Sequence, residues 1–137
     1  MLQAALAHGT AGRRSVFEVF ARALPPGRRY GVVAGTGRLL DCLERFHFTD
    51  DVLADLEQRE VVDGPTLEWL TDYRFTGSVW GYGEGEAYFP YSPLLVVESS
   101  FAEAVLLETL VLSVLNHDSA IASAASRMTA AAQDRPC

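Results

Sequence analysis

The stretch GYGEGEAYFPYSPLLVVE, which runs from Gly81 to Glu98, decides the fold because it predicts short strands that lead directly into a long apolar helix. Its Gly-Glu-Gly and Pro-Tyr-Ser-Pro segments are turn signals between apolar pieces of period two. Strands are expected at 77–82, 87–89 and 94–98. Ser100 and Glu103 form a capping box, which predicts a helix that continues to Met128. Because so apolar a helix needs a large surface to pack against, we expect the chain to be the front part of a bigger protein.

Residues before this stretch predict further short elements. Residues 1–8 have the pattern of the end of a helix, since Gly9 is a suitable stop. Residues 15–22 carry apolar side chains on both faces, which predicts a strand covered on both sides. A further strand is expected at 30–34 and a helix at 38–46. Two more helices are expected to begin at Thr49, which would act as a hydroxyl cap, and at Asp63. The predicted fold class is α/β with an α+β character: a short mixed or antiparallel sheet, covering helices and a long C-terminal helix.

The composition excludes several classes of function. A net charge of −7, from 18 acidic and 11 basic residues, argues against a nucleic-acid-binding surface or an anionic membrane partner. All 11 basic residues are Arg, which excludes a Lys nucleophile, a Schiff base and a P-loop Lys from this chain. The length of 137 residues and the 49% share of hydrophobic residues fit one globular domain with a modest core.

The cysteines and the N-terminus indicate a reduced, cytoplasmic setting. Cys42 and Cys137 form neither a disulfide framework nor a zinc site by themselves. The first residues lack the basic region of an export signal. Charged and polar residues interrupt the last predicted helix, so we expect a buried helix rather than a membrane span.

The segment Gly35-Thr36-Gly37 lies between a predicted strand and a predicted helix. Backbone N–H groups at such a place can hold a phosphate. The dinucleotide fingerprint requires a third Gly three residues later, where this chain has Leu40. The segment is therefore either a tight turn or the basis of a small nucleotide-binding domain.

The histidines and serines give no catalytic pattern. No histidine has metal-ligand spacing to another histidine or to a cysteine, and no serine lies in a Gly-x-Ser-x-Gly elbow. The residues concerned are His8, His47, His117, Ser15, Ser99 and Ser119. Packing or capping is the expected role of the histidines, and neither a metal site nor a hydrolase triad is expected.

The last predicted helix carries two sets of polar residues. Glu103 and Glu108 lie about 140° apart around a helix, so no narrow solvent-exposed stripe holds both. Either one of them is buried and paired, for example with an Arg, or Glu103 frays in the first turn and Glu108 is exposed. Asn116, Ser119 and Ser123 form a polar stripe that either bonds to a neighbouring element or faces a ligand. Asn116 and Ser119 are the candidate substrate-binding residues.

From Phe17 onward, the sequence resembles the N-terminal region of nicotinate phosphoribosyltransferases. The matching segments are FEVFAR at 17–22, YGVVAGTG at 30–37, FPYSPLL at 89–95 and ETLVLSVLNHDS at 108–119, with Ile121 and Ala122. The similarity covers nearly the whole chain, and it is specific in sum although each motif alone is weak.

The resemblance implies a two-part enzyme of the type II phosphoribosyltransferase group. Residues 1–100 would be an N-terminal α/β domain, and residues 101–137 would be a linking helix and the start of an irregular α/β barrel that bears the active site. Such enzymes join nicotinate to phosphoribosyl pyrophosphate, forming nicotinate mononucleotide and pyrophosphate in NAD salvage. The full-length family couples this to ATP hydrolysis through a phosphorylated His, with Mg expected as the metal. The wider group of type II phosphoribosyltransferases works as dimers, which implies a homodimer or other self-association here.

Several family features are absent from this chain. A Thr-Asp-Leu-Tyr segment of the nicotinate pocket would lie before Met1, and the Arg-rich motif, the phosphorylated His and the phosphoribosyl-binding loops would lie beyond Cys137. Tyr91 and Ser99 stand where the family has a Gly and an acidic-Gly step. No residue matches a catalytic motif, and His117 does not match the phosphorylated His. We therefore expect a truncated enzyme that is inactive alone and binds no cofactor itself. The alternative is a non-catalytic module that covers its last helix by dimerising.

Overall fold

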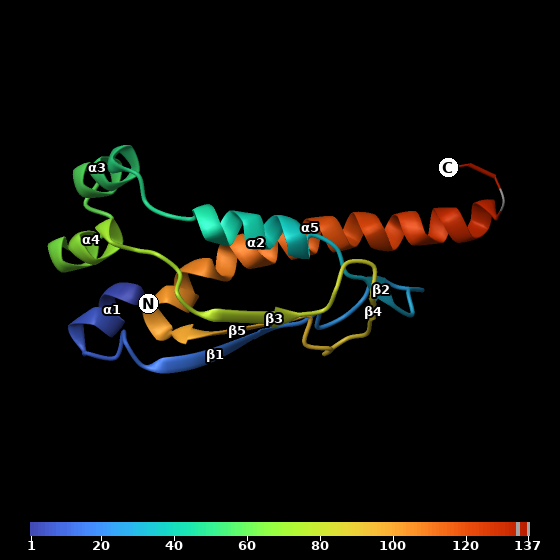
Figure 1. The fold of residues 1–137 in the computed structure, drawn as a ribbon, viewed down its shortest axis with the longest axis horizontal. Helices are drawn as coiled ribbons and strands as arrows, with labels where there is room; N and C mark the ends of the chain where they lie inside the picture. The colour runs from blue at the N-terminus through green and yellow to red at the C-terminus, as the bar shows by residue number, and fades with distance from the viewer. Residues whose placement is uncertain (134, 137) are drawn as a thin grey trace.

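The computed structural model describes residues 1–133, 135 and 136, and in these residues five helices and two small antiparallel sheets are arranged along one long axis (Figure 1). The helices are α1 (Leu2–Ala7), α2 (Thr36–Arg45), α3 (Asp50–Gln58), α4 (Gly64–Thr71) and α5 (Phe101–Ala132). The strands are β1 (Arg14–Val19), β2 (Gly31–Val32), β3 (Ser78–Gly81), β4 (Ala87–Tyr88) and β5 (Leu95–Ser100). Each predicted helix and strand is present, with ends that shift by a few residues.

The larger sheet has the strand order β1-β5-β3, and helix α5 crosses one of its faces (Figure 1). Its register places Val97 of β5 between Phe17 of β1 and Val79 of β3. Since alternate residues of a strand point to opposite faces, these three side chains share the face that packs on the helix. Ser100 ends β5 and caps α5 by accepting a hydrogen bond from the Glu103 N–H, so the predicted start of this helix is confirmed. The Glu103 carboxylate accepts from Thr76 and Ser99 and does not form the second half of a capping box.

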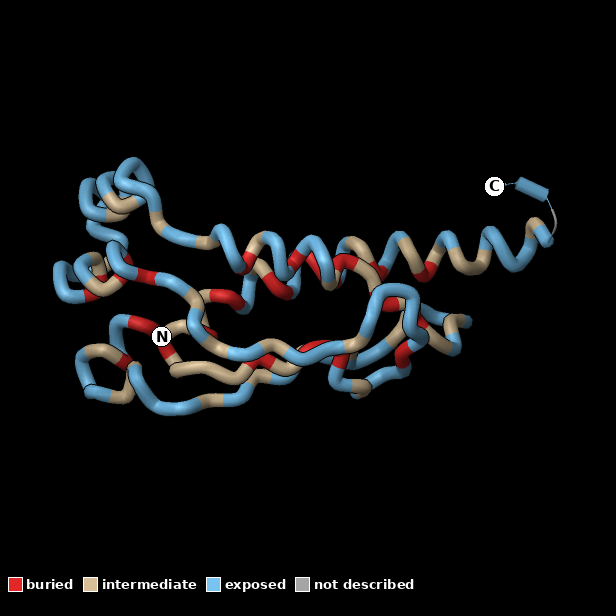
Figure 2. Tube along the Cα trace, in the orientation of Figure 1, coloured by how far each residue is buried: buried red, intermediate tan, exposed pale blue. Residues whose placement is uncertain are grey.

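The main core lies between this sheet, α5 and α2. Helix α2 lies alongside α5 and contributes Leu39 and Leu43, while β5 contributes Leu95 and Val97. Figure 2 shows the buried positions of α5 on the side that faces the sheet. The α5 members of this core are Ala104, Leu107, Val111, Val114 and Leu115. Burying each large aliphatic side chain contributes about 1.5–3 kcal/mol, so this layer is the main source of stability.

Helices α1, α3 and α4 gather near the start of α5, where Leu2, Leu70 and Ala102 form a second buried cluster. Helix α4 begins with Pro65 in its first turn, and the Asp63 carboxylate accepts a hydrogen bond from the Thr66 N–H at 3.0 Å. The predicted hydroxyl cap of α3 is wrong, since the Thr49 side chain makes no capping hydrogen bond. The acidic residues Asp50 and Asp51 in the first turn of α3 remain favourable there because the N-terminus of a helix carries partial positive charge.

The smaller sheet pairs β2 with β4 and lies beside the second half of α5 (Figure 1). Val33, Tyr88 and Leu94 form its own buried cluster. Gly31 lies directly opposite Tyr88, and a Cβ atom on Gly31 would lie 2.2 Å from the Tyr88 ring. Only glycine therefore allows the Tyr88 ring to lie across β2.

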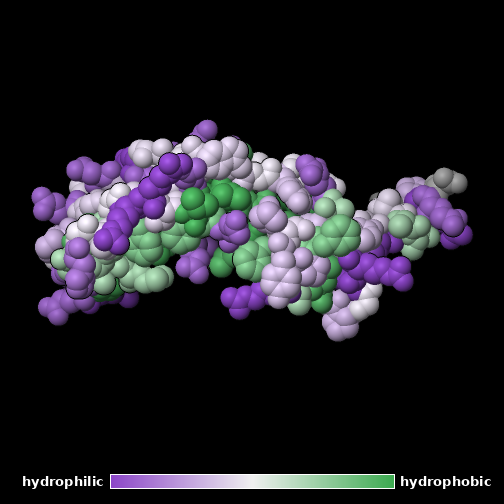
Figure 3. Space-filling model, turned by 90° about the horizontal axis from the view of Figure 1, so that it is seen from below, coloured by the Kyte–Doolittle hydropathy of each residue, from purple (hydrophilic) through white to green (hydrophobic). Residues whose placement is uncertain are grey.

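Within the residues that the structure describes, strand β1 is covered on one side only, so the prediction of a strand covered on both sides at 15–22 is wrong for them. Its inner residues face α5, but Val16 is 58% exposed on the outer face, as is Trp80 of β3 at 53%. Figure 3 views the molecule from the side on which β1 lies and shows apolar surface there between charged side chains. The sequence misled because apolar residues on both faces of a strand do not reveal whether an outer partner is present in the same chain.

Helix α5 spans 32 residues, and its second half extends past the larger sheet (Figure 1). Among the described residues it is the one helix long and apolar enough to cross a membrane by length and composition. The core helix of a folded domain meets the same criteria, and α5 packs on both sheets. Three large apolar residues on it, Leu112, Ile121 and Met128, remain exposed.

Candidate functional site

The polar stripe of α5 bonds chiefly to the neighbouring strand β2. The Ser123 hydroxyl accepts a hydrogen bond from the Val32 N–H at 2.8 Å. The Ser119 hydroxyl accepts from the Ala34 N–H at 3.1 Å and donates to the Ala34 carbonyl at 3.2 Å. Both serines are buried, so these bonds replace water as partners of the strand. Two of the three stripe residues therefore serve the contact with a neighbouring element.

Asn116 differs from the two serines because it is exposed. It lies on the wall of a cleft of about 440 Å³ between the middle of α5, the end of β1 and β4. The cleft is lined by Val19, Phe20, Ala21, Tyr88, Leu94, Leu112, Ser113, Leu115, Asn116 and Ser119. The structure thus places both candidate substrate-binding residues at one cleft, with the Asn116 amide at its surface and Ser119 in its buried wall.

Arg127 continues the link between α5 and the loop before β2. Its guanidinium donates a hydrogen bond to the Tyr30 carbonyl at 2.8 Å and a second one to the Ser123 carbonyl. The same guanidinium lies 5.1 Å from the centre of the Tyr30 ring, within the range of a cation–π contact. This end of α5 is therefore held by directional polar contacts.

The Gly35-Thr36-Gly37 segment forms a tight turn at the start of α2, where Gly35 has a φ of +93°. The N–H groups of Gly35 and Gly37 each donate to the Glu84 carboxylate at 3.0 Å. A carboxylate of the chain itself therefore takes the place where a phosphate would bind. These residues do not fit the phosphate groups of ATP.

Arg38, in the first turn of α2, binds Asp118 of α5 through two hydrogen bonds of 2.9 and 2.7 Å. The Arg38 guanidinium and, to a lesser extent, His117 hold the pKa of Asp118 below its usual range. His117 Nδ1 lies 2.9 Å from Asp118, and its ring is largely exposed. This cluster joins α2 to α5 directly beside the Glu84 contact with Gly35.

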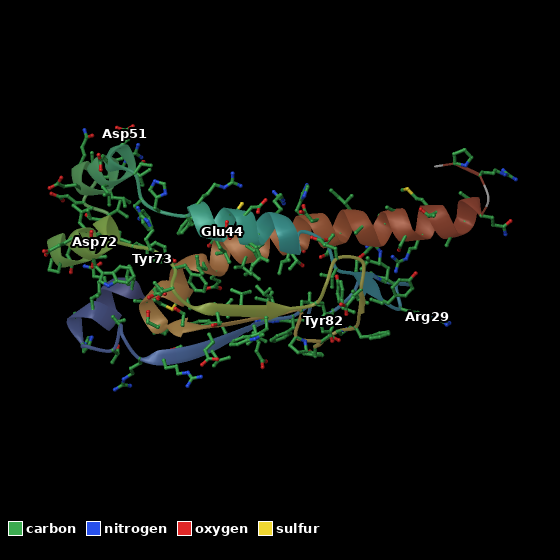
Figure 4. The ribbon with its side chains drawn as sticks, in the orientation of Figure 1. Arg29, Glu44, Asp51, Asp72, Tyr73 and Tyr82 are labelled. Carbon is green, nitrogen blue, oxygen red and sulfur yellow. The ribbon has the colours of Figure 1, made fainter. Side chains whose placement is uncertain are left out.

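A larger cleft, of about 690 Å³, lies between α1, α4 and the start of α5. Asp72 and Tyr73, just after α4, lie on it (Figure 4). Glu103 also lines it and accepts hydrogen bonds from the Thr76 N–H at 2.9 Å and from the Ser99 hydroxyl at 2.7 Å. One of the two glutamates is thus partly buried and paired, although with hydroxyl and amide groups rather than an Arg.

The pKa values of Glu103 and Tyr73 follow from these contacts and from burial. Burial favours the neutral form of Glu103, yet the hydrogen bonds from Thr76, Ser99 and Ser100 together outweigh it, and the pKa of Glu103 falls below its ordinary value. Burial, aided by the Glu103 charge, raises the pKa of Tyr73 far above its ordinary value. Glu103 is therefore a fixed anion and Tyr73 a fixed neutral phenol at neutral pH, and neither is suited to move a proton.

The described residues offer no site for a metal. Within residues 1–133, 135 and 136, no three His, Cys, Asp or Glu side chains come together as metal ligands. His8 and His47 each hydrogen-bond a nearby backbone carbonyl, in line with the capping role predicted for the histidines. Cys42 is a free thiol on α2, and Cys137 lies outside the described residues. These described residues do not fit Mg either.

Sequence reasoning missed Glu84 and Asp118. Their partners, Gly35 and Arg38, are 49 and 80 residues away in the chain, so no local spacing reveals the pairs. The one available signal was that Glu84 lies in a Gly-Glu-Gly turn, where its side chain is free to reach another element.

A protein-family model matches the part of the chain that contains the segments resembling nicotinate phosphoribosyltransferases. The model described as the nicotinate phosphoribosyltransferase (NAPRTase) N-terminal domain matches residues 1–116. The match includes α1–α4, all five strands and the first half of α5.

Curated relatives match almost the whole chain. The Mycobacterium tuberculosis protein nicotinate phosphoribosyltransferase pncB1 is 60% identical over 136 residues, which are 99% of this chain and 30% of that protein. Nicotinate phosphoribosyltransferase of Bacillus subtilis is 35% identical and covered over 24% of its length. The chain therefore spans about a third or less of the relatives it matches.

Solved structures share the fold of this chain. The crystal structure of human nicotinic acid phosphoribosyltransferase superposes with a TM-score of 0.90 over 99% of this chain and 28% of that one, at 27% identity. Nicotinate-nucleotide pyrophosphorylase from Pyrococcus furiosus shares the fold with a TM-score of 0.69.

Proposed function

Because this chain belongs to the nicotinate phosphoribosyltransferase family, we propose that it supplies the N-terminal domain of an enzyme that joins nicotinate to phosphoribosyl pyrophosphate in NAD salvage. The products would be nicotinate mononucleotide and pyrophosphate. The observation that carries the proposal is the 60% identity to the Mycobacterium tuberculosis relative across 136 residues. The proposal is limited to this domain because the chain spans 30% of that relative.

In this proposal, residues 1–100 form the N-terminal domain, and residues 101–137 form a helix that leads to a catalytic barrel. Leu107 and Val111 fix α5 to the larger sheet, while the exposed Ile121 and Met128 are available to a further layer. Exposed apolar side chains on an otherwise packed helix favour such a contact. The 137-residue chain alone would then be catalytically inactive.

Asn116 and Ser119 are the residues of this chain that we propose to lie nearest a substrate. Asn116 supports this role because its amide lies on the surface of the 440 Å³ cleft, where it can donate and accept hydrogen bonds. Ser119 already exchanges two hydrogen bonds with Ala34, so its contribution would be to hold the cleft wall in place.

The partners and cofactors are likewise proposed for the complete enzyme and not for this domain alone. Nicotinate and phosphoribosyl pyrophosphate would bind the complete enzyme, and ATP and Mg would act there too. We place the enzyme in the cytoplasm, in agreement with a free thiol at Cys42.

A chimera tests the proposal. The part of the Mycobacterium tuberculosis relative that aligns with this chain is replaced by residues 1–137, and formation of nicotinate mononucleotide is measured by chromatography with nicotinate, phosphoribosyl pyrophosphate, ATP and Mg. We expect the chimera to be active and the isolated 137-residue chain to be inactive.

Two controls make the result decisive. Nicotinamide replaces nicotinate as a substrate control, and a chimera built with the 41%-identical segment of nicotinate phosphoribosyltransferase pncB2 is the folding control. A chimera that folds like its parent and yet makes no nicotinate mononucleotide, while the pncB2 chimera does, would contradict the proposal. Turnover by the isolated chain would contradict its inactivity.

A further inference from the structure

A small hollow adjoins the cleft that contains Asn116. It has a volume of about 130 Å³ and lies between the loop that leads into β2, strand β4 and helix α5. Ala21, Tyr88 and Asn116 line both the small hollow and the 440 Å³ cleft, so the two spaces lie side by side. Asn116 therefore presents its amide to both.

Tyr88 brings a buried hydroxyl group to the small hollow. Its side chain lies across Gly31, where a Cβ atom would be 2.5 Å from the Tyr88 hydroxyl, and Gly31 itself lines the hollow. Tyr88 is only 8% exposed. Within residues 1–133, 135 and 136, the hydroxyl of Tyr73 is the one tyrosine hydroxyl with a hydrogen-bond partner in the chain. Since buried hydroxyl groups are normally hydrogen-bonded, the Tyr88 hydroxyl points to a polar ligand in the hollow.

Arg28 brings a positive charge to the same hollow. A turn places it there, in which Gly27 has a φ of +78° and the Arg28 N–H donates to the Pro25 carbonyl at 3.1 Å. Its side chain is partly buried and lines the hollow. None of the ion pairs among the described residues uses Arg28, so its guanidinium is available to a ligand.

The charge of the lining favours an anion. The chain has 18 acidic residues and a net charge of −7, yet no described Asp or Glu lines the small hollow or the adjoining cleft. The 690 Å³ cleft, in contrast, is lined by four residues with carboxylate side chains. Arg28, Tyr88 and Asn116 thus offer hydrogen-bond donors where no carboxylate of the described chain competes for them.

The size and polarity of the hollow favour a carboxylate over a phosphate. Arg28 supplies a single positive charge, and its guanidinium matches the two oxygens of a carboxylate. Leu24 and Pro25 add apolar wall, against which a second negative charge would be costly to bury. The same apolar wall suits a small hydrocarbon or aromatic body next to the carboxylate.

We propose that this hollow is a binding site for a small monocarboxylate, in which Arg28 pairs with the carboxylate group and the Tyr88 hydroxyl and the Asn116 amide donate hydrogen bonds to it. The inference goes beyond the proposed function, which assigns no role to Arg28 or Tyr88. It depends on the hollow alone, since these three donors all belong to this chain.

Benzoate and benzamide form a matched pair of probes for the 137-residue chain, because they have the same ring with and without the negative charge. Titration followed by ¹H–¹⁵N NMR should show saturable shifts for residues around the hollow with benzoate, with a Kd of about 1 mM. Benzamide and inorganic phosphate should bind at least about tenfold more weakly. Intermolecular NOEs from the benzoate ring to Tyr88 and Ala120 should locate the ligand.

Two substitutions test the donors. Arg28→Gln should weaken benzoate binding at least about tenfold, and Tyr88→Phe, which keeps the ring, should weaken it about threefold or more. Arg29→Gln and Tyr91→Phe are the matched controls, since both residues are exposed and line neither space. The controls should bind benzoate as the wild type does, and circular dichroism should show that all four variants are folded.

Several results would overturn the proposal. These are the absence of saturable benzoate binding, equal binding of benzamide or phosphate, or a folded Arg28→Gln chain that binds benzoate like Arg29→Gln. None of these results depends on catalysis. The formation of nicotinate mononucleotide by the chimera tests the proposed function separately, so failure of one proposal is distinguishable from failure of the other.

Discussion

Ser119 and Ala34 exchange two hydrogen bonds, in which the serine hydroxyl accepts from the Ala34 N–H at 3.1 Å and donates to its carbonyl at 3.2 Å. One side chain of α5 thus satisfies both backbone groups of a residue 85 positions away. A hydroxyl can do this because it is donor and acceptor at once. The loop between β2 and α2 therefore takes its position from α5.

We predict that Ser119→Ala lowers the free energy of unfolding by about 1–3 kcal/mol, because two backbone groups lose their partner in a buried site. Urea unfolding followed by circular dichroism measures the change. Ser113→Ala, at an exposed position on the same helix, should be within about 0.5 kcal/mol of the wild type. Equal effects of the two substitutions would show that the Ser119 bonds contribute nothing.

Gly35→Ala should be destabilising for a different reason. Gly35 has a φ of +93°, and a Cβ atom there would lie 2.7 Å from the Asp118 carboxylate. Backbone strain of this kind costs about 1–3 kcal/mol, and displacement of Asp118 would also loosen its pair with Arg38. Thermal unfolding measures the loss, with Gly64→Ala as the control because nothing lies within 4 Å of its Cβ position. A Gly35→Ala chain as stable as Gly64→Ala would contradict the role of the turn.

The pH dependence of stability should report on Glu103. Its pKa is lowered in the folded chain, so the folded state favours the carboxylate. The resulting stabilisation is complete above the ordinary value of 4.5 and is lost as the pH falls through the lower folded value. Glu103→Gln should lower the free energy of unfolding at pH 7 by about 1–3 kcal/mol and flatten its decline below pH 4.5.

Unfolding by urea at a series of pH values from 7 to 3 measures this profile. Glu108→Gln, at an exposed position of the same helix, should keep the wild-type stability at pH 7. Asp63 and Asp118 also have lowered pKa values and are unchanged in both variants, so part of the acid sensitivity should remain. An unaltered slope in Glu103→Gln would show that its hydrogen bonds do not favour the carboxylate.

The substrate-side role of Asn116 is testable in the active chimera. Asn116→Ala should lower kcat/KM for nicotinate about tenfold, which corresponds to the loss of one good hydrogen bond. Thr109→Ala is the matched control, since Thr109 is exposed on α5 and lies outside the cleft. Thermal unfolding of both variants should match the parent chimera. Equal kinetics of the two variants would remove Asn116 from the site.

The elements of this fold were predictable because their signals are local. Ser100 with Glu103 and Asp63 with Pro65 fix two helix starts within four residues of sequence. Strand β1 was predicted to be covered on both faces, and its exposed Val16 shows the limit of such patterns: the sequence of a strand does not show whether it lies at an edge.

The candidate site was less predictable because its contacts join distant parts of the chain. Asn116 and Ser119 are candidates from a polar stripe on an apolar helix, and the structure brings them to one cleft. Glu84 escaped prediction because its side chain replaces an external anion at Gly35 and Gly37, a role that no spacing rule describes.

Helix α5 carries a row of residues at intervals of four that changes character along its length. Leu107, Val111 and Leu115 are apolar and pack in the main core, whereas Ser119, Ser123 and Arg127 hydrogen-bond the backbone around β2. Apolar packing tolerates small shifts along the helix axis. A shift by one residue, however, moves each side chain by about 1.5 Å and rotates it by about 100°, which breaks the hydrogen bonds of the hydroxyl groups. The polar end of α5 therefore fixes the position of the helix along its own axis. The apolar packing of the first half alone would not fix that position.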